Sequence, residues 1–437
     1  MNEIAGADRR RLWDMGKVVG IDSAAIKRGK RPAGTVNRRR KQESKTALVL
    51  GGGGFTGGVY EIGALRALDL LSVNKTVNQF DVYVGTSAGS FVAALTANGV
   101  TPEEMMRVVV QQAPVPFRDI DVGTMLRPNW REFLSGSLTL PWRLGGVAKD
   151  LLGNPGSVTA MDIMLGLAEA LPSGLYAGDG LAKYLREVLG DPDRTDDFRQ
   201  LERELYIAAT DLDSCERVVL GAEGWDDVPI SSAVQASTAL PMVYRPVELK
   251  GRELVDGGIV STTNLDIAVE AGAKFIVVVN PLVPYVNEMG TPTKSGGNRS
   301  RISDMGFQHI GYQTFKLLAY QRLHEMRAQW ESRYPGVDIL LIEPEANDEL
   351  MFKTSVMNFT SRLEIARHGF QSVTMKLSED YERLKRMSAN HGVEISATRV
   401  RKVVKHFTSE QEKSRAWRRI LEQTTSTLLR QSADERG

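Results

Sequence analysis

The sequence is poor in cysteine, in long hydrophobic runs and in net charge, and each shortage excludes a class of protein. A single cysteine, Cys215, excludes an intrachain disulfide framework and fits a reducing compartment. No apolar run reaches the roughly 18 to 20 residues that a membrane-spanning helix needs. A formal net charge of +1 argues against general nucleic-acid binding. The sequence also lacks an H-E-x-x-H motif and a Cys/His cluster, so it predicts no metal site.

The remaining composition is that of a globular protein. Of its 437 residues, 42% are hydrophobic and 25% are charged, which allows a sizeable core. Charged residues such as Arg9, Arg10 and Arg11 interrupt any signal-peptide apolar core, so we expect a cytoplasmic protein. Residues 1–45 hold 13 Lys and Arg against 5 Asp and Glu, without sustained periodicity. This segment is predicted to be a poorly ordered basic arm.

A strand–turn–helix pattern with a central serine lies at residues 80–99. Residues 80–84 are aromatic and β-branched enough for a short strand, and residues 91–97 fit a helix that Asn98-Gly99 would close. Between them, Gly85-Thr86-Ser87-Ala88-Gly89 matches the G-x-S-x-G pattern of a nucleophile elbow. The two glycines permit a sharp turn, and the Ser87 hydroxyl would project at the N-terminus of the helix. The alternative is an ordinary strand-to-helix turn built from small residues.

A glycine-rich loop precedes this pattern. Residues 46–50 read as a buried strand, residues 51–58 are mostly glycine, and apolar residues then recur at helical spacing. A Walker A loop is excluded because no Gly-Lys-Ser/Thr follows. Gly52-x-Gly54-x-x-Gly57 formally matches a dinucleotide fingerprint, but Asp81 begins the second strand where that fingerprint expects an acidic residue at the end. The serine downstream favours a third interpretation, an oxyanion hole.

Strands are also expected near residues 205–211, 253–256, 274–280 and 337–342, with helices between them. The pattern predicts an α/β fold with a parallel-rich central sheet flanked by helices. Both the glycine loop and the serine turn follow strands, so we expect them at the carboxyl edge of that sheet. Asp256-Gly257-Gly258 ends another strand. Taken alone, Asp256 fits a turn residue that bonds its own backbone.

The order of these motifs resembles the patatin-like phospholipases: the glycine loop, then Gly85-x-Ser87-x-Gly89, then Asp256-Gly257-Gly258. Three further stretches are similar to blocks of that family, namely Gly174-Leu175, Ala209-Thr210-Asp211-Leu212 with Glu216, and Ala236-Ser237 through Leu240-Pro241 with Pro246-Val247. The resemblance covers about residues 46–285 and extends more loosely to about 345. Two positions depart from the family pattern. Thr56 stands where the loop usually carries Arg or Lys, and Asn264-Leu265-Asp266 replaces a frequent Asn-x-Pro.

The resemblance implies a patatin-like α/β/α sandwich and a Ser87–Asp256 dyad that hydrolyses lipid esters without histidine. Backbone amides around Gly52, Gly53 and Gly54 would bind the oxyanion, and no cofactor is expected. The implied supporting glycines are Gly57, Gly85, Gly89, Gly257 and Gly258. Composition and patterning, together with the extent of the resemblance, predict three parts: the basic arm 1–45, a catalytic domain 46–345 with a lid-like insertion at 100–180, and a helical C-terminal extension 346–437.

Other functions stay open at this point. An α/β-hydrolase triad needs a histidine after the acid, and the chain order of His309, His324, His368, His391 and His406 satisfies this requirement. However, the first three lie in expected helices and the last two lie near the C-terminal tail. A dinucleotide-dependent oxidoreductase and a catalytically silent, lipid-binding member of the fold are further alternatives. The lipid head group, the acyl chain, water or another alcohol as acceptor, and the oligomeric state do not follow from the sequence.

The two ends of the chain suggest contact with a membrane surface. Trp417, Leu421, Thr424 and Leu428 share one face of an expected helix, with basic residues around it. This face either packs on the catalytic domain or, together with the arm 1–45, holds the protein to an anionic bilayer.

Overall fold

The computed structural model describes residues 44–109, 117–118, 122–130, 132, 172–287, 301–353 and 361–405. The basic arm except Ser44 and Lys45, the greater part of the lid-like insertion, much of the polar loop 286–304, and the C-terminal stretch from His406 lie outside these residues. The predictions made for those segments therefore stay predictions. None of the helices in the described ranges combines the length and apolar character that crossing a bilayer requires.

A mixed sheet of eight strands forms the centre of the fold, in the order β10-β9-β1-β2-β4-β8-β7, with β5 also pairing with β4. The first five strands in this order are mutually parallel: β10 (Asp338–Ile342), β9 (Phe275–Val279), β1 (Thr46–Leu50), β2 (Val82–Thr86) and β4 (Glu204–Asp211). The other edge is antiparallel and consists of β5 (Arg217–Leu220), β7 (Val247–Leu249) and β8 (Arg252–Asp256). The parallel-rich sheet predicted from the sequence is thereby confirmed.

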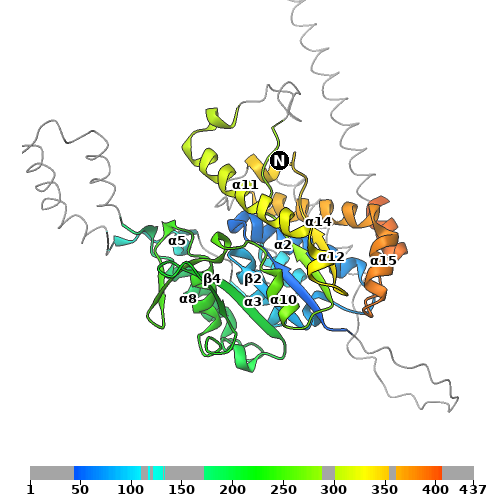
Figure 1. Ribbon diagram of the computed structural model, residues 1–437, viewed down its shortest axis with the longest axis horizontal. Helices are drawn as coiled ribbons and strands as arrows, with labels where there is room; N and C mark the ends of the chain where they lie inside the picture. The colour runs from blue at the N-terminus through cyan, green and yellow to red at the C-terminus, as the bar shows by residue number, and fades with distance from the viewer. Residues whose placement is uncertain are drawn as a thin grey trace, which may run out of the picture. The chain divides into compact units, whose positions relative to one another are not determined.

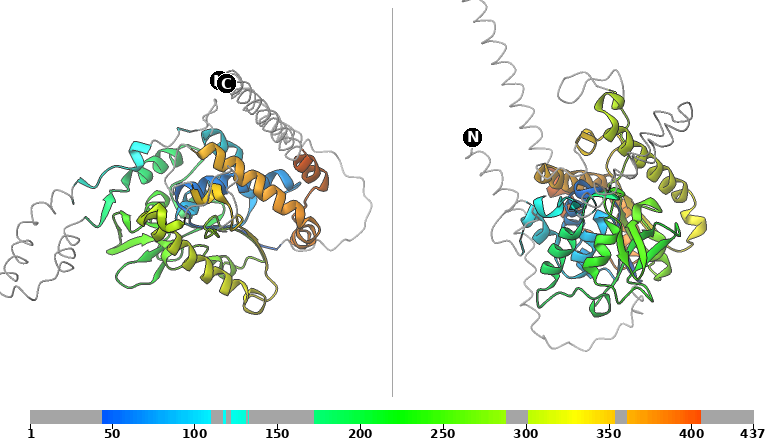
Figure 2. Two further views of the ribbon diagram at one scale, coloured as in Figure 1. Left: turned by 90° about the horizontal axis from the view of Figure 1, so that it is seen from above. Right: turned by 90° about the vertical axis from the view of Figure 1, so that its left-hand side faces the viewer.

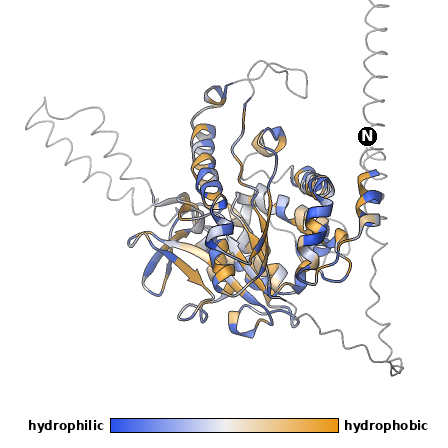
Figure 3. Ribbon diagram, turned by 45° about the vertical axis from the view of Figure 1, so that its right-hand side comes forward, coloured by the Kyte–Doolittle hydropathy of each residue, from blue (hydrophilic) through white to orange (hydrophobic). Residues whose placement is uncertain are grey.

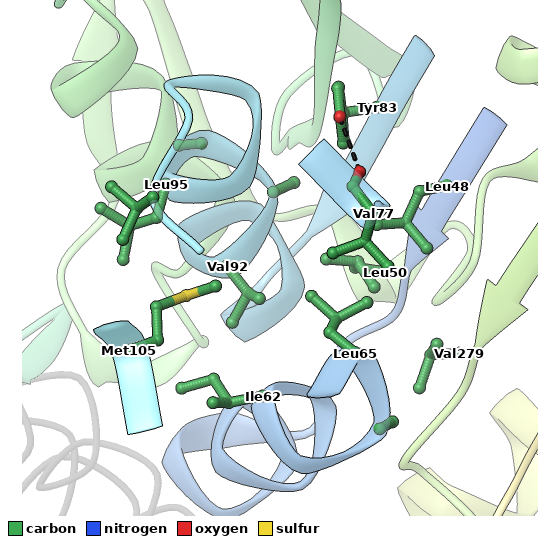
Figure 4. Packing of buried hydrophobic residues seen from close by; sticks show 14 of the residues in the cluster. Leu48, Leu50, Ile62, Leu65, Val77, Tyr83, Val92, Leu95, Met105 and Val279 are labelled. Atoms are coloured by element: carbon green, nitrogen blue, oxygen red, sulfur yellow. Dashed lines mark hydrogen bonds between the residues drawn. The ribbon is translucent and has the colours of Figure 1, made fainter. Parts of the chain in front are cut away.

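Hydrophobic side chains cover both faces of the sheet because successive residues of a strand point to opposite sides. In β1, Leu48 and Leu50 belong to one buried cluster, whereas Ala47 and Val49 belong to a second. Figure 4 shows part of the first cluster, where Leu48 and Leu50 lie close to side chains of α2 (Gly54–Leu71) and α3 (Ala88–Ala97). The unbroken apolar runs of the central strands follow from this burial on both faces.

Helices form a layer on each face of the sheet (Figures 1 and 2). The first cluster takes buried side chains from α2, α3, α4 (Pro102–Val109), α8 (Asp179–Leu189), α9 (Ile230–Ser237) and α14 (Arg362–Glu379). The second takes them from α10 (Leu265–Glu270), α11 (Phe307–Arg327) and α12 (Trp330–Arg333). Coloured by hydropathy, the surrounding helices carry both hydrophobic and hydrophilic residues, as helices that bury one side require (Figure 3).

Helix α14 packs closely on α2, and small residues make this possible. A Cβ on Gly63 of α2 or on Gly369 of α14 would overlap backbone atoms of the other helix. Helices α13 (Glu349–Lys353) and α15 (Tyr381–Ala389) flank α14 along the chain, so the residues after 345 that the structure describes are mainly helical, as predicted. The division into domains at residue 345 stays a prediction.

A small second sheet lies outside the main one. It pairs β3 (Gly174–Tyr176) with β6 (Met242–Tyr244) in parallel. Leu175 and Met242 of this sheet are exposed, as is Trp130, whose neighbour Asn129 hydrogen-bonds the backbone of Gly174 and Leu175.

Candidate active site

The register of three neighbouring strands brings residues far apart in sequence to one point. Thr86, the last residue of β2, pairs with Ala208 of β4, and the next residue, Ala209, pairs with Asp256 at the end of β8. Ser87 directly follows Thr86. The glycine loop follows β1, the parallel neighbour of β2, so its residues begin at the same edge of the sheet. The expected grouping at the carboxyl edge of the sheet is present.

Ser87 and Asp256 are in direct contact. The Ser87 hydroxyl donates a hydrogen bond of 2.5 Å to Oδ2 of Asp256. Both side chains are buried, with 8% of Ser87 and 3% of Asp256 exposed. The second carboxylate oxygen, Oδ1, accepts a hydrogen bond of 2.7 Å from the amide of Gly258. Each oxygen of the carboxylate therefore has one donor.

Ser87 has a strained backbone, with φ of 53° and ψ of −127°. Such a positive φ is costly for a residue with a side chain and is found where a turn must present that side chain. The flanking glycines permit the turn, because a Cβ on Gly85 would overlap Ser90, and one on Gly89 would overlap the backbone of Leu50 and Gly51. The amide of Ser87 is held by the hydroxyl of Ser237 at 2.9 Å.

Burial changes the acidity of Asp256. Desolvation raises the pKa of its carboxyl to about 6, and the hydrogen bonds from Ser87 and Gly258 counteract part of this rise. Gly257 lies against the carbonyl of Ala208, where a Cβ would not fit, and Asp256 caps the short 3-10 helix Gly257–Ile259. Asp256 therefore also bonds its own backbone as a turn residue does, and this role coexists with its contact to Ser87.

The glycine loop lies against the serine. A Cβ on Gly52 would be 3.2 Å from Cβ of Ser87, so the backbone passes close to the hydroxyl. The amide of Gly52 is already bonded to the carbonyl of Thr262 at 3.2 Å. Within the described ranges, the amides of Gly53 and Gly54 donate to no other group. The expected oxyanion hole at Gly52, Gly53 and Gly54 stays a prediction, and of these three amides only that of Gly52 has a partner within the described residues. Gly57 packs on Pro281 and donates to the carbonyl of Gly53.

A buried serine, Ser237, connects the Ser87 turn to strand β4. The Ser237 hydroxyl accepts from the amide of Ser87 and donates to the carbonyl of Ala208 at 2.6 Å. The sequence marked Ala236-Ser237 as a block similar to the family but assigned it no role. In the sequence, the only indication of a special role for Ser237 was its place at the end of an expected helix that Pro241 stops.

A second network that the sequence did not reveal holds Thr86, the residue before Ser87. The side-chain nitrogen Nδ2 of Asn264 donates to Oγ1 of Thr86 at 2.9 Å and to the carbonyl of Ser261 at 2.7 Å. Nη1 of Arg217 donates to Oδ1 of Asn264 at 3.0 Å, and Arg217 also forms a two-pronged ion pair with Asp266. Asp266 stands where the family pattern has proline, so this departure places a charge that fixes Arg217, and Arg217 in turn fixes Asn264.

The histidines in the described part of the chain bond elsewhere. His309 contacts the carbonyl of Met305, one turn earlier in the chain. The other three contact carboxylates: His324 with Glu343, His368 with Asp348 and His391 with Asp338. The direct bond from Ser87 to Asp256 leaves no gap between them for an imidazole. Among the same residues, no group of three or more His, Cys, Asp or Glu side chains could hold a metal ion. His406 lies outside the described residues.

Comparison with known proteins agrees with this geometry. The family model "Patatin-like phospholipase" matches residues 48–269, which is just over half of the chain. A protein described as "Probable lipid hydrolase 463L", from Invertebrate iridescent virus 6, is 21% identical over 51% of this chain and 63% of its own length. An uncharacterized Bacillus subtilis protein, YqhO, is 24% identical over 47% of this chain and 64% of its own. The chain thus spans somewhat less than two thirds of these relatives.

Solved structures are also similar, though distantly. VipD from Legionella pneumophila aligns with 77% of this chain and 67% of its own at 16% identity, with a TM-score of 0.35. The type III effector ExoU of Pseudomonas aeruginosa aligns with 77% of this chain and 53% of its own at 16% identity, with a TM-score of 0.31. Scores this low do not by themselves establish a common fold. With the family model matching both the serine turn and the glycine loop, the chain belongs to the patatin-like phospholipase family.

Proposed function

We propose that this protein is a lipid acyl hydrolase in which Ser87 is the nucleophile and Asp256 is the general base. The observation that carries the proposal is the 2.5 Å hydrogen bond from the buried Ser87 hydroxyl to the Asp256 carboxylate. A serine hydroxyl becomes nucleophilic when a base within hydrogen-bond reach takes its proton. A screen of phospholipids, lysophospholipids and neutral glycerides, with wild type against Ser87→Ala, tests the activity and identifies the substrate.

The reaction follows from these contacts. Oγ of Ser87 attacks the ester carbonyl carbon while its proton passes to Oδ2 of Asp256. The carbonyl oxygen becomes an oxyanion, which the free amides of Gly53 and Gly54 stabilise. Asp256 then returns the proton to the leaving alcohol as the carbon–oxygen bond breaks, which leaves an acyl group on Ser87. Water attacks this acyl-enzyme in the same way and releases the fatty acid.

Burial makes Asp256 a better base than an ordinary aspartate. A carboxylate with a pKa near 4 is a weak acceptor for a hydroxyl proton at neutral pH. The pKa of about 6 at Asp256 brings the group closer to the operating pH while leaving it ionised near pH 7. The strained backbone of Ser87 and the hydrogen bond that its amide donates to the Ser237 hydroxyl fix the position of residue 87 beside Asp256.

Exposed apolar side chains near the site support a lipid substrate. Ile259, three residues after Asp256, is 44% exposed. Met242 is 80% exposed and lies three residues after Ala239, whose carbonyl accepts the Asp256 amide. Leu175 of the small sheet and Trp130 are also exposed, at 50% and 65%. Apolar groups exposed near a polar site suit acyl chains and lipid surfaces. Attachment to an anionic bilayer through the two chain ends is part of the same proposal.

The pH dependence of kcat/KM should report Asp256. Because the ionised carboxylate is the base, kcat/KM should fall about tenfold per pH unit below pH 6 and level off above it. Initial rates on a neutral ester between about pH 4 and about pH 9 measure this profile. A midpoint near pH 7 or above would instead indicate a histidine base.

Removing Arg217 should slow the chemical step and leave substrate binding intact. In Arg217→Met, Asn264 loses the donor that orients it, so Thr86 and the adjacent Ser87 become less well positioned. Small misplacement of a reacting group is costly, so we expect kcat to fall roughly tenfold with KM changed less than about twofold. Steady-state kinetics separates the two constants.

Arg199→Met is the matched control, because Arg199 makes a comparable two-pronged contact with Asp197 on an exposed turn. Equal effects of the two substitutions on kcat would exclude a positioning role for Arg217. Arg217→Lys retains the charge but not both prongs, so its kcat should be intermediate.

A further inference from the structure

Lys316, in the middle of α11, is a buried cation without a counterion in contact. Only 3% of the residue is exposed. In the part of the chain that the structure describes, its amine has neither a hydrogen bond nor an ion pair, and it lies 4.6 Å from the centroid of the Tyr312 ring. Asp348 is the carboxylate whose charge acts on the amine, but Asp348 is bonded to His368. Burial lowers the pKa of the Lys316 amine to about 8, so it is still mainly protonated at neutral pH.

Such an arrangement destabilises the folded protein unless something compensates for it. An ammonium that has left water and lacks a hydrogen-bonded partner has a large desolvation penalty. A single aromatic ring offsets only part of that penalty. Ionisable groups whose pKa is strongly shifted by burial are enriched at functional sites.

The same helix contacts the turn after Asp256 and the segment that packs on the glycine loop. Cζ of Phe315, the residue before Lys316, lies 3.8 Å from the position that a Cβ on Gly258 would take, and Gly258 bonds Asp256. Gln313 exchanges two hydrogen bonds with the backbone of Tyr285, at 3.1 and 2.8 Å. Tyr285 belongs to the segment that begins at Pro281, which packs on Gly53 and Gly57 of the glycine loop.

Three apolar side chains of α11 are exposed over the same turns. Ile310, Leu317 and Leu318 are 46%, 45% and 64% exposed. Their spacing of seven and eight residues places them on one helical face. The helix that carries Lys316 therefore also has apolar side chains open to solvent.

We propose that Lys316 and Tyr312 form a subsite for the anionic group of a lipid, either the phosphate of a phospholipid head group or the carboxylate of a released fatty acid. The ammonium donates charge-assisted hydrogen bonds to the anionic oxygens, and the Tyr312 ring packs beside it. This subsite rests on the proposed lipid hydrolase function but is tested without turnover.

The experiment measures binding to the Ser87→Ala protein, which cannot consume a ligand through Ser87. Isothermal titration compares dodecyl phosphate, dodecanoate, dodecanol and inorganic phosphate, with the amphiphiles kept below their aggregation concentrations. The comparison separates the contribution of the anionic group to binding from that of the alkyl chain. We expect the preferred anionic amphiphile to bind at least about tenfold more tightly than dodecanol. Preference for dodecyl phosphate assigns the subsite to a head group, and preference for dodecanoate assigns it to the product.

Adding Lys316→Met should remove this preference, so that the anionic ligands bind no better than dodecanol. Lys316→Arg retains the charge and should keep at least part of the preference. If the Lys316→Met variant does not fold, the same binding measurement is made on Lys316→Gln, which should also lose the preference. Arg322→Met, which removes an exposed cation two turns further along α11, is the matched control and should change nothing. An unchanged preference in Lys316→Met, or equal binding of dodecanol to the parent protein, would overturn the subsite and leave the role of Ser87 untouched.

Discussion

Ser87→Ala is expected to lose ester hydrolysis by at least about 100-fold, because the variant has no oxygen with which to form the acyl-enzyme. The fold should persist. Alanine keeps the Cβ that the turn already accommodates, and the amide of residue 87 still bonds the Ser237 hydroxyl. The main structural loss is the donor to Asp256, whose Oδ2 would then lack its partner in the described structure. That loss should make the carboxyl still harder to ionise.

Circular dichroism and thermal unfolding establish that the Ser87→Ala protein is folded. Ser231→Ala is a suitable control, since it removes a buried serine hydroxyl that bonds Asp196 away from the site. Its activity should stay within a few-fold of wild type. Residual hydrolysis by purified Ser87→Ala above about a hundredth of the wild-type rate would move the nucleophile to another residue.

Asp256→Asn should cost about as much activity as Ser87→Ala, to within an order of magnitude, because two groups that act as a unit fail together. The substitution is close to isosteric. The asparagine oxygen can accept from the amide of Gly258, and its NH₂ can donate to the Ser87 oxygen, so both contacts survive. What disappears is the capacity to take the serine proton. A loss of only a few-fold would make Asp256 a structural turn residue and would require another base.

Asp256→Asn should lower activity but not the free energy of unfolding. Because the folded pKa of Asp256 is about 6 and the unfolded value is near 4, the folded protein binds this proton more tightly. The associated stability is complete below pH 4 and is lost as pH rises through 6, by about 3 kcal/mol at most. Asp256→Asn removes this effect. Its free energy of unfolding should therefore match or exceed that of wild type at pH 8, and the difference should shrink toward pH 4.

Local patterns in the sequence were sufficient for the fold and for the positions of the main candidates. The buried run 46–50, the turn around Ser87 and the glycines beside Asp256 each have a local cause, namely strand propensity or a backbone that excludes Cβ. Their order along the chain then implied that they meet at one sheet edge. The structure added the strand register that pairs Ala209 with Asp256, and this register brings Asp256 into contact with Ser87.

Contacts between distant side chains could not be predicted in this way. Asn264 bonds Thr86 across 178 residues, and Ser237 bonds Ser87 across 150. Such pairs leave no periodicity that a single sequence reveals. The use of the Gly52 amide by Thr262 is likewise a property of the assembled loops. Lys316 is an ordinary helical lysine in the sequence, and only its 3% exposure in the fold makes it notable.

The central claim, that Ser87 is activated by Asp256, is tested most directly by labelling with a fluorophosphonate. Oγ of an activated serine attacks the phosphorus and displaces fluoride, which leaves a phosphonyl group that peptide mass spectrometry can locate. We predict an adduct on Ser87 in wild type, labelling slower by about two orders of magnitude in Asp256→Asn, and none at this position in Ser87→Ala. An adduct on a different serine, or undiminished labelling of Ser87 in Asp256→Asn, would contradict the proposed dyad.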